Sequence, residues 1–236
     1  MNVSPVAARC MVVIPAYREA GRVGPTVTGV RRFCPNVVVV DDGSGDKTAE
    51  EAASAGAEVI RHERNMGKGA SLDDGIRHAR SKGYEVVVTM DGDGQHAPSD
   101  LPAFMDAYAQ GHAPVLVGNR MANPKSMPLI RKLTNWFMSW LLSRRMSQWV
   151  TDTQCGYRLY ACAVLDGVSV RSGGFAADSE ILLALAEKGV RMGAVPIEVI
   201  YRDEKSKIRP FRDTIRFFRM LRRYDVDART RKAARY

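Results

Sequence analysis

The first half of the chain alternates short apolar runs with amphipathic stretches. Residues 37–40 are four valines without polar alternation, which is typical of a parallel strand buried on both faces. The stretches between such runs carry apolar residues at helical spacing, and this alternation of strand with helix predicts a doubly wound α/β sheet. The predicted strands are 11–14, 37–40, 57–60, 86–90, 115–120 and 196–201. The predicted helices are 24–33, 48–55, 69–81, 98–108, 129–146 and 181–186.

Polar side chains follow three of the predicted strands at their carboxyl ends. Tyr17 and Glu19 follow the first strand. Asp41 and Asp42 follow the second, and the polar residues of 91–95 follow the fourth. Ligands of doubly wound sheets bind beyond the carboxyl ends of the strands. The shared position predicts one site built from several loops, although Asp41 also suits a turn or a helix cap.

The segment 91–95 has the composition of a metal site. If the chain stays extended, its period of two places Asp91, Asp93 and Gln95 on one side. Two carboxylates and a carboxamide oxygen suit Mg²⁺ or Mn²⁺. The alternative is a solvated Asp-Gly turn. An EF-hand is excluded, because the position that needs a bidentate Glu is occupied by Pro102.

Two common nucleotide-binding loops are excluded by the same strand ends. A dinucleotide-binding chain carries G-x-G-x-x-G after the first strand, where this chain has Pro15 and Tyr17. A P-loop requires glycine immediately before its lysine, and here Asp46 precedes Lys47.

Composition and charge describe an ordinary globular chain with a basic end. Of 236 residues, 45% are hydrophobic and 26% charged, so the chain can bury a large core. The four cysteines lack metal-binding spacing, which favours free thiols in a reducing cytoplasm. No apolar run is long enough to span a membrane, and no export signal is present at the N-terminus. The net charge is +9, and residues 201–236 contribute +8 of it, which predicts a basic arm that attracts a polyanion.

Two predicted helices are amphipathic in an unusual way. In 211–223 the apolar and arginine positions separate onto opposite sides, with Phe211, Ile215, Phe218 and Leu221 on the apolar side. We interpret this helix as a membrane-surface element, or as a docking helix for a partner or second subunit; nucleic acid is the least favoured ligand. In 129–146 one arc of the wheel is apolar and aromatic and another is polar and basic. That helix either lies at a membrane interface or packs on the sheet. The apolar arc contains Leu129, Leu133, Trp136, Phe137 and Trp140.

Four segments resemble a known family. Residues 14–19, 40–44, 64–69 and 91–96 occur in the order, and at about the spacing, found in the inverting family 2 glycosyltransferases of GT-A fold. Within that family, residues 11 to 210 most resemble the dolichyl-phosphate and polyprenyl-phosphate sugar synthases. One departure is that those synthases often carry D-A-D-L-Q-H, where this chain has glycine at both intervening positions. The resemblance implies a Rossmann-like, mostly parallel sheet flanked by helices in residues 1–210, followed by the basic arm 211–236.

The resemblance also implies a reaction and a donor site. A sugar such as mannose, glucose or N-acetylglucosamine would move from a GDP- or UDP-sugar to a polyprenyl or dolichyl phosphate. Asp91, Asp93 and Gln95 would hold the Mg²⁺ or Mn²⁺ that offsets charge on the leaving diphosphate. The residues assigned to the nucleotide-sugar are Pro15, Tyr17, Glu19, Asp42, Lys68, Asp91, Gly92 and Asp93.

On the acceptor side, residues 152–158 and 175–180 match further segments of the family. Guanidinium groups suit phosphate, and 202–207 is expected to close over the phosphates as a mobile loop. The resemblance implies catalytic roles for Asp93, Arg120, Arg158 and Asp178. It implies acceptor or phosphate binding by Arg120, Arg131, Arg202, Lys205 and Lys207.

The chemistry of the acceptor decides whether a base is needed. A lipid monophosphate is already anionic, whereas a sugar hydroxyl needs a carboxylate such as Asp178 or Glu180 within reach. Transfer to a saccharide or small-molecule hydroxyl is therefore the alternative within enzymes. A basic α/β module that binds nucleic acid is the alternative outside them. We expect the protein in the cytoplasm, at the inner face of the membrane.

Overall fold

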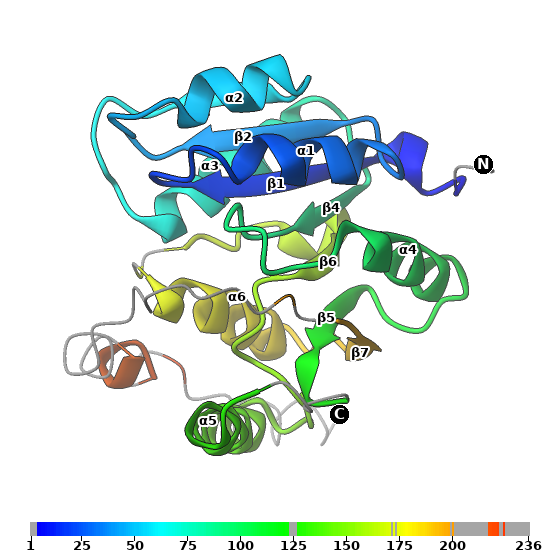
Figure 1. The fold of residues 1–236 in the computed structure, drawn as a ribbon. Coiled ribbons are helices and arrows are strands. Elements are labelled where there is room, and N and C mark those ends of the chain that lie inside the picture. The colour runs from blue at the N-terminus through cyan, green and yellow to red at the C-terminus, as the bar shows by residue number, and fades with distance from the viewer. Residues whose placement is uncertain are drawn as a thin grey trace.

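The protein folds around one seven-stranded sheet in the order β3-β2-β1-β4-β6-β5-β7 (Figure 1). The computed structural model describes residues 4–122, 127–170, 172, 174–198, 200, 217–221 and 224. The strands are β1 Cys10–Ala16, β2 Val37–Asp41, β3 Glu58–Arg61, β4 Val86–Thr89, β5 Val115–Asn119, β6 Arg158–Ala161 and β7 Met192–Pro196. The main helices are α1 Val23–Arg31, α2 Thr48–Ser54, α3 Lys68–Ser81, α4 Leu101–Ala109, α5 Leu129–Met146 and α6 Phe175–Glu187.

The first half of the sheet is parallel, as the sequence predicts. β1 lies between β2 and β4 and pairs in parallel with both, and β3 pairs in parallel with β2. Every residue of β2 and β4 is buried, because helices cover both faces. On one side α1 contacts α2 and the 3-10 turn before α4; on the other, α3 contacts α6, which contacts α5. The predicted doubly wound, mostly parallel α/β sheet is confirmed.

The second half of the sheet contains a strand that the sequence pattern misses. β6 lies antiparallel between β4 and β5. It is only four residues long and begins with the charged Arg158, so it carries no apolar run. The predicted strand 196–201 is wrong. β7 instead pairs with β5 from Met192 to Pro196. Pro196 pairs with Asn119, the last residue of β5, so β7 has no further strand to pair with beyond this point.

The amphipathic helices bury different faces from those expected. Four of the five residues of the apolar arc of α5 are exposed and Trp140 is partly buried, so the interpretation in which this arc packs on the sheet is wrong. In the described part of the basic arm, helical residues 217–221 bury Phe217 and Leu221 but leave Phe218 half exposed. The rest of 211–236 lies outside the described residues. Across the described ranges no helix combines the length and the apolar character of a membrane span.

The four cysteines are free thiols, as predicted. Cys10, Cys34 and Cys155 are buried, and Cys162 is partly buried. Burial raises the pKa of Cys155 to about 12. This thiol therefore packs as a small apolar group and stays protonated at neutral pH.

Candidate active site

The segment after β4 is a turn, not a continuation of the strand. β4 ends at Thr89, and Asp93 Oδ1 accepts a hydrogen bond from the Gln95 amide at 3.0 Å. Gly94 has a φ of +75°, a conformation that favours glycine. The prediction that an extended chain aligns Asp91, Asp93 and Gln95 is therefore wrong. The three side chains are instead presented by one tight turn at the carboxyl end of β4.

Gly92 lets this turn lie against the end of β1. A Cβ at Gly92 would lie 3.3 Å from Ile14 Cγ2 and 3.4 Å from both Ala16 Cβ and the Pro15 carbonyl oxygen. The distance to Ile14 is slightly tighter than ordinary van der Waals contact, so a larger residue at this position would require a shift of a few tenths of an ångström. Both glycines of the segment thus have a structural reason, and Pro15 is placed beside the turn.

Lys68 joins two carboxylates that are far apart in the sequence. Its Nζ lies 2.6 Å from Asp91 Oδ1 and 2.8 Å from Asp178 Oδ2. Burial alone would lower the pKa of Lys68, but the Asp178 and Asp91 carboxylates raise it above its ordinary value. Burial raises the pKa of Asp91, and the charges of Lys68 and His96 outweigh burial and lower it. Lys68 and Asp91 are therefore both ionised at neutral pH.

Three separate elements build this cluster. Lys68 is the first residue of α3, Asp91 follows β4, and Asp178 lies in the first turn of α6. The parallel arrangement brings the start of α3 and the end of β4 to the same edge of the sheet. α6 packs against α3 and supplies the third member. The fold thus brings Lys68 and Asp178, which are 110 positions apart in the sequence, together at one edge of the sheet.

The loop before β6 closes one side of Asp91. A Cβ at Gly156 would lie 2.7 Å from Asp91 Oδ2 and 3.0 Å from Lys68 Nζ. Thr89 Oγ1 donates to the Gly156 carbonyl at 2.8 Å and holds the loop there. The buried His96 lies on the same carboxylate, with Nε2 3.6 Å from Asp91 Oδ2. Only glycine at 156 allows this approach.

The residues of the turn fit a hard divalent cation. Asp91 and Asp93 offer carboxylate oxygens and Gln95 a carboxamide oxygen, which are donors that Mg²⁺ and Mn²⁺ accept. The Asp91 side chain keeps 29% of its surface exposed despite its ion pair. Among the residues that the structure describes, no group of three or more His, Cys, Asp or Glu side chains is placed to hold a metal. A cation at this turn would therefore depend on Gln95 as well as on carboxylates.

Asp42 anchors the loop that leads into α3. Its carboxylate accepts hydrogen bonds from the backbone amides of Met66 and Gly67, both at 2.7 Å. It also lies 2.8 Å from His62 Nδ1, whose Nε2 is 3.1 Å from Asp74. The Asp42 side chain is nearly buried. Its geometry is that of a loop anchor, and the predicted contact with base or ribose stays a prediction.

Asp41 has the turn role that the sequence allowed as an alternative. Its Oδ1 accepts from the Ser44 amide at 3.1 Å, and its Oδ2 lies 3.3 Å from Arg61 Nε. The carboxylate is fully buried. It stabilises the start of the loop between β2 and α2.

The loop after β1 holds the two other residues assigned to the nucleoside. Tyr17 is partly exposed, and the Arg18 guanidinium lies 5.3 Å from its ring centroid. Glu19 is buried, with Oε2 3.2 Å from Arg22 Nε. Its amide donates to Thr48 Oγ1 at 2.9 Å. A partly exposed aromatic ring and a carboxylate held by a neighbouring cation suit recognition of a nucleoside.

Arg120 is held by a buried carboxylate. Its Nε and one terminal nitrogen lie 2.7 and 2.8 Å from the two oxygens of Asp152, and its backbone amide donates to the same side chain at 3.1 Å. Asp152 is fully buried, while Arg120 keeps 17% of its side chain exposed. This bidentate pair fixes the end of β5 to the loop before β6. Phosphate binding by Arg120 stays a prediction.

Arg158 occupies the core and faces protein carbonyl groups. Its Nε donates to the Cys155 carbonyl at 2.7 Å, and its terminal nitrogens donate to the carbonyls of Thr153 and Asp178. The side chain is fully buried. Through these hydrogen bonds Arg158 ties the loop before β6 to the start of α6. The phosphate contact that its motif suggests for Arg158 stays a prediction.

The remaining predicted cations lie away from these contacts or outside the described residues. Arg131 is partly exposed on α5. Arg202, Lys205 and Lys207 lie outside the described residues. The chain approaches the turn just before them, since the Ile200 amide donates to the Gln95 carbonyl at 2.9 Å.

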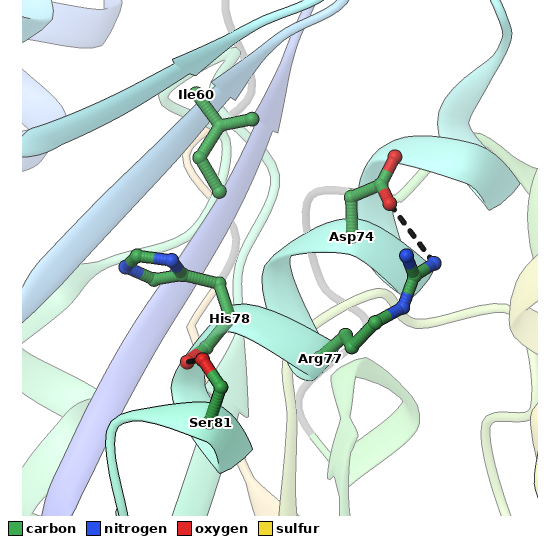
Figure 2. Close-up of a pocket in the computed structure, with 5 residues that line it drawn as sticks. All are labelled: Ile60, Asp74, Arg77, His78 and Ser81. Carbon is green, nitrogen blue, oxygen red and sulfur yellow. Dashed lines mark hydrogen bonds and ion pairs between the residues drawn. The ribbon is translucent and has the colours of Figure 1, made fainter.

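A shallow hollow on α3 is a separate feature. It is lined by Ile60 of β3 and by Asp74, Arg77, His78 and Ser81 of α3 (Figure 2). Arg77 and Asp74 are paired with each other at 3.0 Å. These α3 residues lie toward the end of the helix that leads back to the start of β4, away from Lys68. The hollow is therefore not the donor site predicted at the carboxyl ends of the strands.

Sequence reasoning missed several residues of the site. Asp152 belongs to a matched segment, but its pairing with Arg120 depends on the packing of that segment against the end of β5, which no local pattern shows. His96 and Gly156 also lie within matched segments, but the approach of Gly156 to Asp91 depends on the antiparallel insertion of β6. His62 follows a short edge strand, and no pattern in the sequence marks it.

Comparison with known proteins identifies the family of this chain. The family described as "Glycosyl transferase family 2" matches residues 11–177. The chain belongs to this family. It is 30% identical to the UDP-N-acetylglucosamine–dolichyl-phosphate N-acetylglucosaminyltransferase of Methanococcus voltae over 81% of this chain and 86% of that one. It is 30% identical to the undecaprenyl-phosphate mannosyltransferase of Micrococcus luteus, over 83% and 85% of the two chains.

Two solved structures share the fold of this chain. The mannosyl-3-phosphoglycerate synthase of Rubrobacter xylanophilus aligns with a TM-score of 0.70 at 19% identity, over 100% of this chain and 80% of that one. The glucosyl-3-phosphoglycerate synthase of Mycobacterium tuberculosis, solved with Mg²⁺ and uridine diphosphate, aligns with a TM-score of 0.68 at 17% identity, over 94% and 81%. At these identities the likeness shows the fold alone. The GT-A fold is confirmed, and this family 2 protein is a glycosyltransferase.

Proposed function

We propose that this glycosyltransferase moves a sugar from a nucleoside-diphosphate sugar to a polyprenyl phosphate, with the help of a divalent cation. The observation that carries the proposal is the convergence of Lys68, Asp91 and Asp178 from three elements at the carboxyl edge of the sheet. A partly exposed carboxylate next to a fixed ammonium group suits a cation and a diphosphate side by side. The names of the relatives above support the lipid-phosphate acceptor.

Asp91, Asp93 and Gln95 are the residues that would hold the cation. When bound, it would supply positive charge where the leaving diphosphate becomes more negative. Lys68 keeps Asp91 ionised and in place, and Gly156 leaves its carboxylate room. We propose that Pro15, Tyr17 and Glu19, at the end of the neighbouring β1, border the nucleoside.

The state of the two candidate bases favours a phosphate acceptor. Asp178 is paired with Lys68, and its side chain is almost fully buried. Glu180 is buried and accepts from the Ser172 amide at 2.6 Å and from the Tyr224 hydroxyl at 3.4 Å. A carboxylate held in this way is a poor general base. A lipid phosphate oxygen is already anionic and can attack the anomeric carbon without one.

The rival functions have weaker support. A hydroxyl acceptor would need a base that these contacts do not provide. The nucleic-acid module rests on charge alone, and that charge is concentrated in residues 201–236. Ile200 brings the chain to Gln95 immediately before this basic segment, which favours a role for the segment at the phosphates of a donor or acceptor.

A panel of nucleotide sugars tests the proposal. We expect UDP- or GDP-sugars of one base class to raise the Tm of the protein when Mn²⁺ is present and not when it is chelated, because a ligand stabilises the state that binds it. The stabilising donor should then yield a lipid-linked sugar with a short-chain polyprenyl phosphate. Transfer to a sugar hydroxyl but not to the lipid phosphate would contradict the proposal, as would stabilisation that is independent of metal.

Replacing Lys68 separates its structural role from the metal. In the presence of a metal chelator, the Lys68→Met variant is expected to have a free energy of unfolding lower by about 1–2 kcal/mol. The reason is that two neighbouring carboxylates lose the ammonium group that they share in a partly exposed site. Millimolar Mn²⁺ should recover part of this loss. Urea unfolding with and without Mn²⁺ measures both, and Lys68→Arg, which keeps the charge, is the control. An equal loss in both conditions would show that these carboxylates do not take a cation.

A further inference from the structure

α5 is folded with its polar face inward. Ser139 Oγ accepts from the Thr153 amide at 2.9 Å, and Ser143 Oγ accepts from the Val150 amide at 3.0 Å. Both serines and Asn135 are buried. The helix therefore uses its polar stripe to hold the loop that follows it, and the apolar arc is left on the other side.

The outward face of α5 is apolar along several turns. Its side chains are between 49% and 81% exposed. Single exposed apolar residues are common, but a continuous row on one helix marks an interaction surface. The Phe137 and Trp140 rings stack with centroids 6.1 Å apart, and the Arg144 guanidinium lies 5.5 Å from the Trp140 ring. The exposed row is Leu129, Ile130, Leu133, Trp136 and Phe137.

The charges on α5 select the partner. The helix contains four basic residues and no acidic residue in 18 positions, and Lys132 and Arg144 are exposed. A two-fold contact between copies of this chain would set one basic face against another. An anionic bilayer provides the opposite charge, and tryptophan and arginine are favoured at its headgroup level. Charge complementarity therefore favours a lipid surface over a second copy.

The same helix is connected to the candidate active site. Its inner stripe holds Val150 and Thr153, and the loop continues to Gly156 beside Asp91. In Figure 1, α5 forms the end of the molecule opposite α2. We propose that α5 docks the enzyme on an anionic membrane, with its exposed apolar row buried among the lipid headgroups. The proposal rests on the proposed function for the nature of the acceptor, because a polyprenyl phosphate carries its phosphate at that level.

Vesicle binding by the full-length chain tests α5 apart from catalysis. The vesicles contain phosphatidylglycerol and phosphatidylcholine but no acceptor lipid, and the salt concentration is near 0.15 M. The triple variant Leu133→Ser, Trp136→Ser, Phe137→Ser is expected to bind about tenfold more weakly than the wild type, since it removes most of the inserted apolar area. Its urea midpoint should fall only slightly, because each of the three side chains is about half exposed. Binding equal to that of the wild type would overturn the proposal.

A charge pair gives a second, milder test that does not depend on the triple variant folding. Lys132→Glu on α5 should weaken binding to anionic vesicles several-fold, whereas Arg32→Glu, an exposed position at the end of α1, should not. If the two variants weaken binding equally, the interaction depends only on the net charge of the protein, and the docking role of α5 is overturned. Loss of a dimer in the triple variant, with vesicle binding kept, would identify a second copy as the occupant instead.

The outcomes separate this inference from the proposed function. A short-chain, soluble polyprenyl phosphate does not require a membrane, so the triple variant should turn it over at the wild-type rate. Failure of the wild type to use that acceptor would contradict the proposed function. Failure of the α5 variants to lose vesicle binding would contradict the docking helix alone.

Discussion

Asp93→Ala is expected to lower the rate of sugar transfer by on the order of 10³-fold while leaving the protein folded. Asp93 lies in the turn after β4, where one carboxylate oxygen accepts from the Gln95 amide at 3.0 Å. The other role that we propose for this side chain is to hold the cation. The rate is measured with saturating Mn²⁺ and a short-chain polyprenyl phosphate.

Stability controls complete this experiment. Loss of one turn hydrogen bond should cost about 1 kcal/mol, far less than the expected change in rate. Asp106→Ala, at an exposed position of α4, is the matched control and should leave the rate unchanged. In Asp93→Ala, Mn²⁺ should no longer raise the Tm. Wild-type turnover in this variant, with stabilisation by Mn²⁺ retained, would remove Asp93 from the metal site.

Arg158→Met is expected to destabilise the protein by about 3 kcal/mol or more, because it leaves three buried carbonyl groups without their donor. Those carbonyls belong to Thr153, Cys155 and Asp178, and they join the loop before β6 to α6. Urea unfolding followed by circular dichroism measures the loss. Arg77→Met is the control, because Arg77 is 68% exposed and makes a surface ion pair worth less than about 1 kcal/mol.

The same variant distinguishes a structural arginine from a ligand. If Arg158 held a phosphate, as its motif suggested, the variant would keep its stability and lose affinity for the donor or acceptor. The structure predicts instead that the variant loses stability, and that its activity decreases as a consequence because the loop at Gly156 is no longer held in place. A variant of unchanged stability with a raised KM would overturn the structural assignment.

Particular residues show why the sequence pattern was reliable in one half of the sheet and not in the other. Valine runs such as 37–40 have one favourable use, which is a strand buried on both faces. β6 has no such run. Its burial depends instead on its insertion between β4 and β5 and on the hydrogen bonds that Arg158 donates to backbone carbonyls. The end of β7 was misplaced for a related reason, since pairing with β5 decides it.

The site divides in the same way. The polar strand ends were readable in the sequence, and the structure gathers them at the carboxyl edge of the parallel strands. The alignment of Asp91, Asp93 and Gln95 by strand period was not correct, because a glycine-containing turn intervenes. The bridge from Lys68 to Asp178 spans 110 positions, and no local pattern contains such a distance.

α5 gives the sharpest contrast. Its helical period, its apolar arc and its polar arc follow from the sequence alone, because side-chain spacing along a helix is a local property. The sequence by itself therefore determined the doubly wound sheet, the edge that carries the chemistry and the two faces of α5. Which face of α5 turns inward, and the burial of Arg158 among backbone carbonyls, were decided only by the tertiary structure, because burial depends on what the rest of the chain places opposite each side chain.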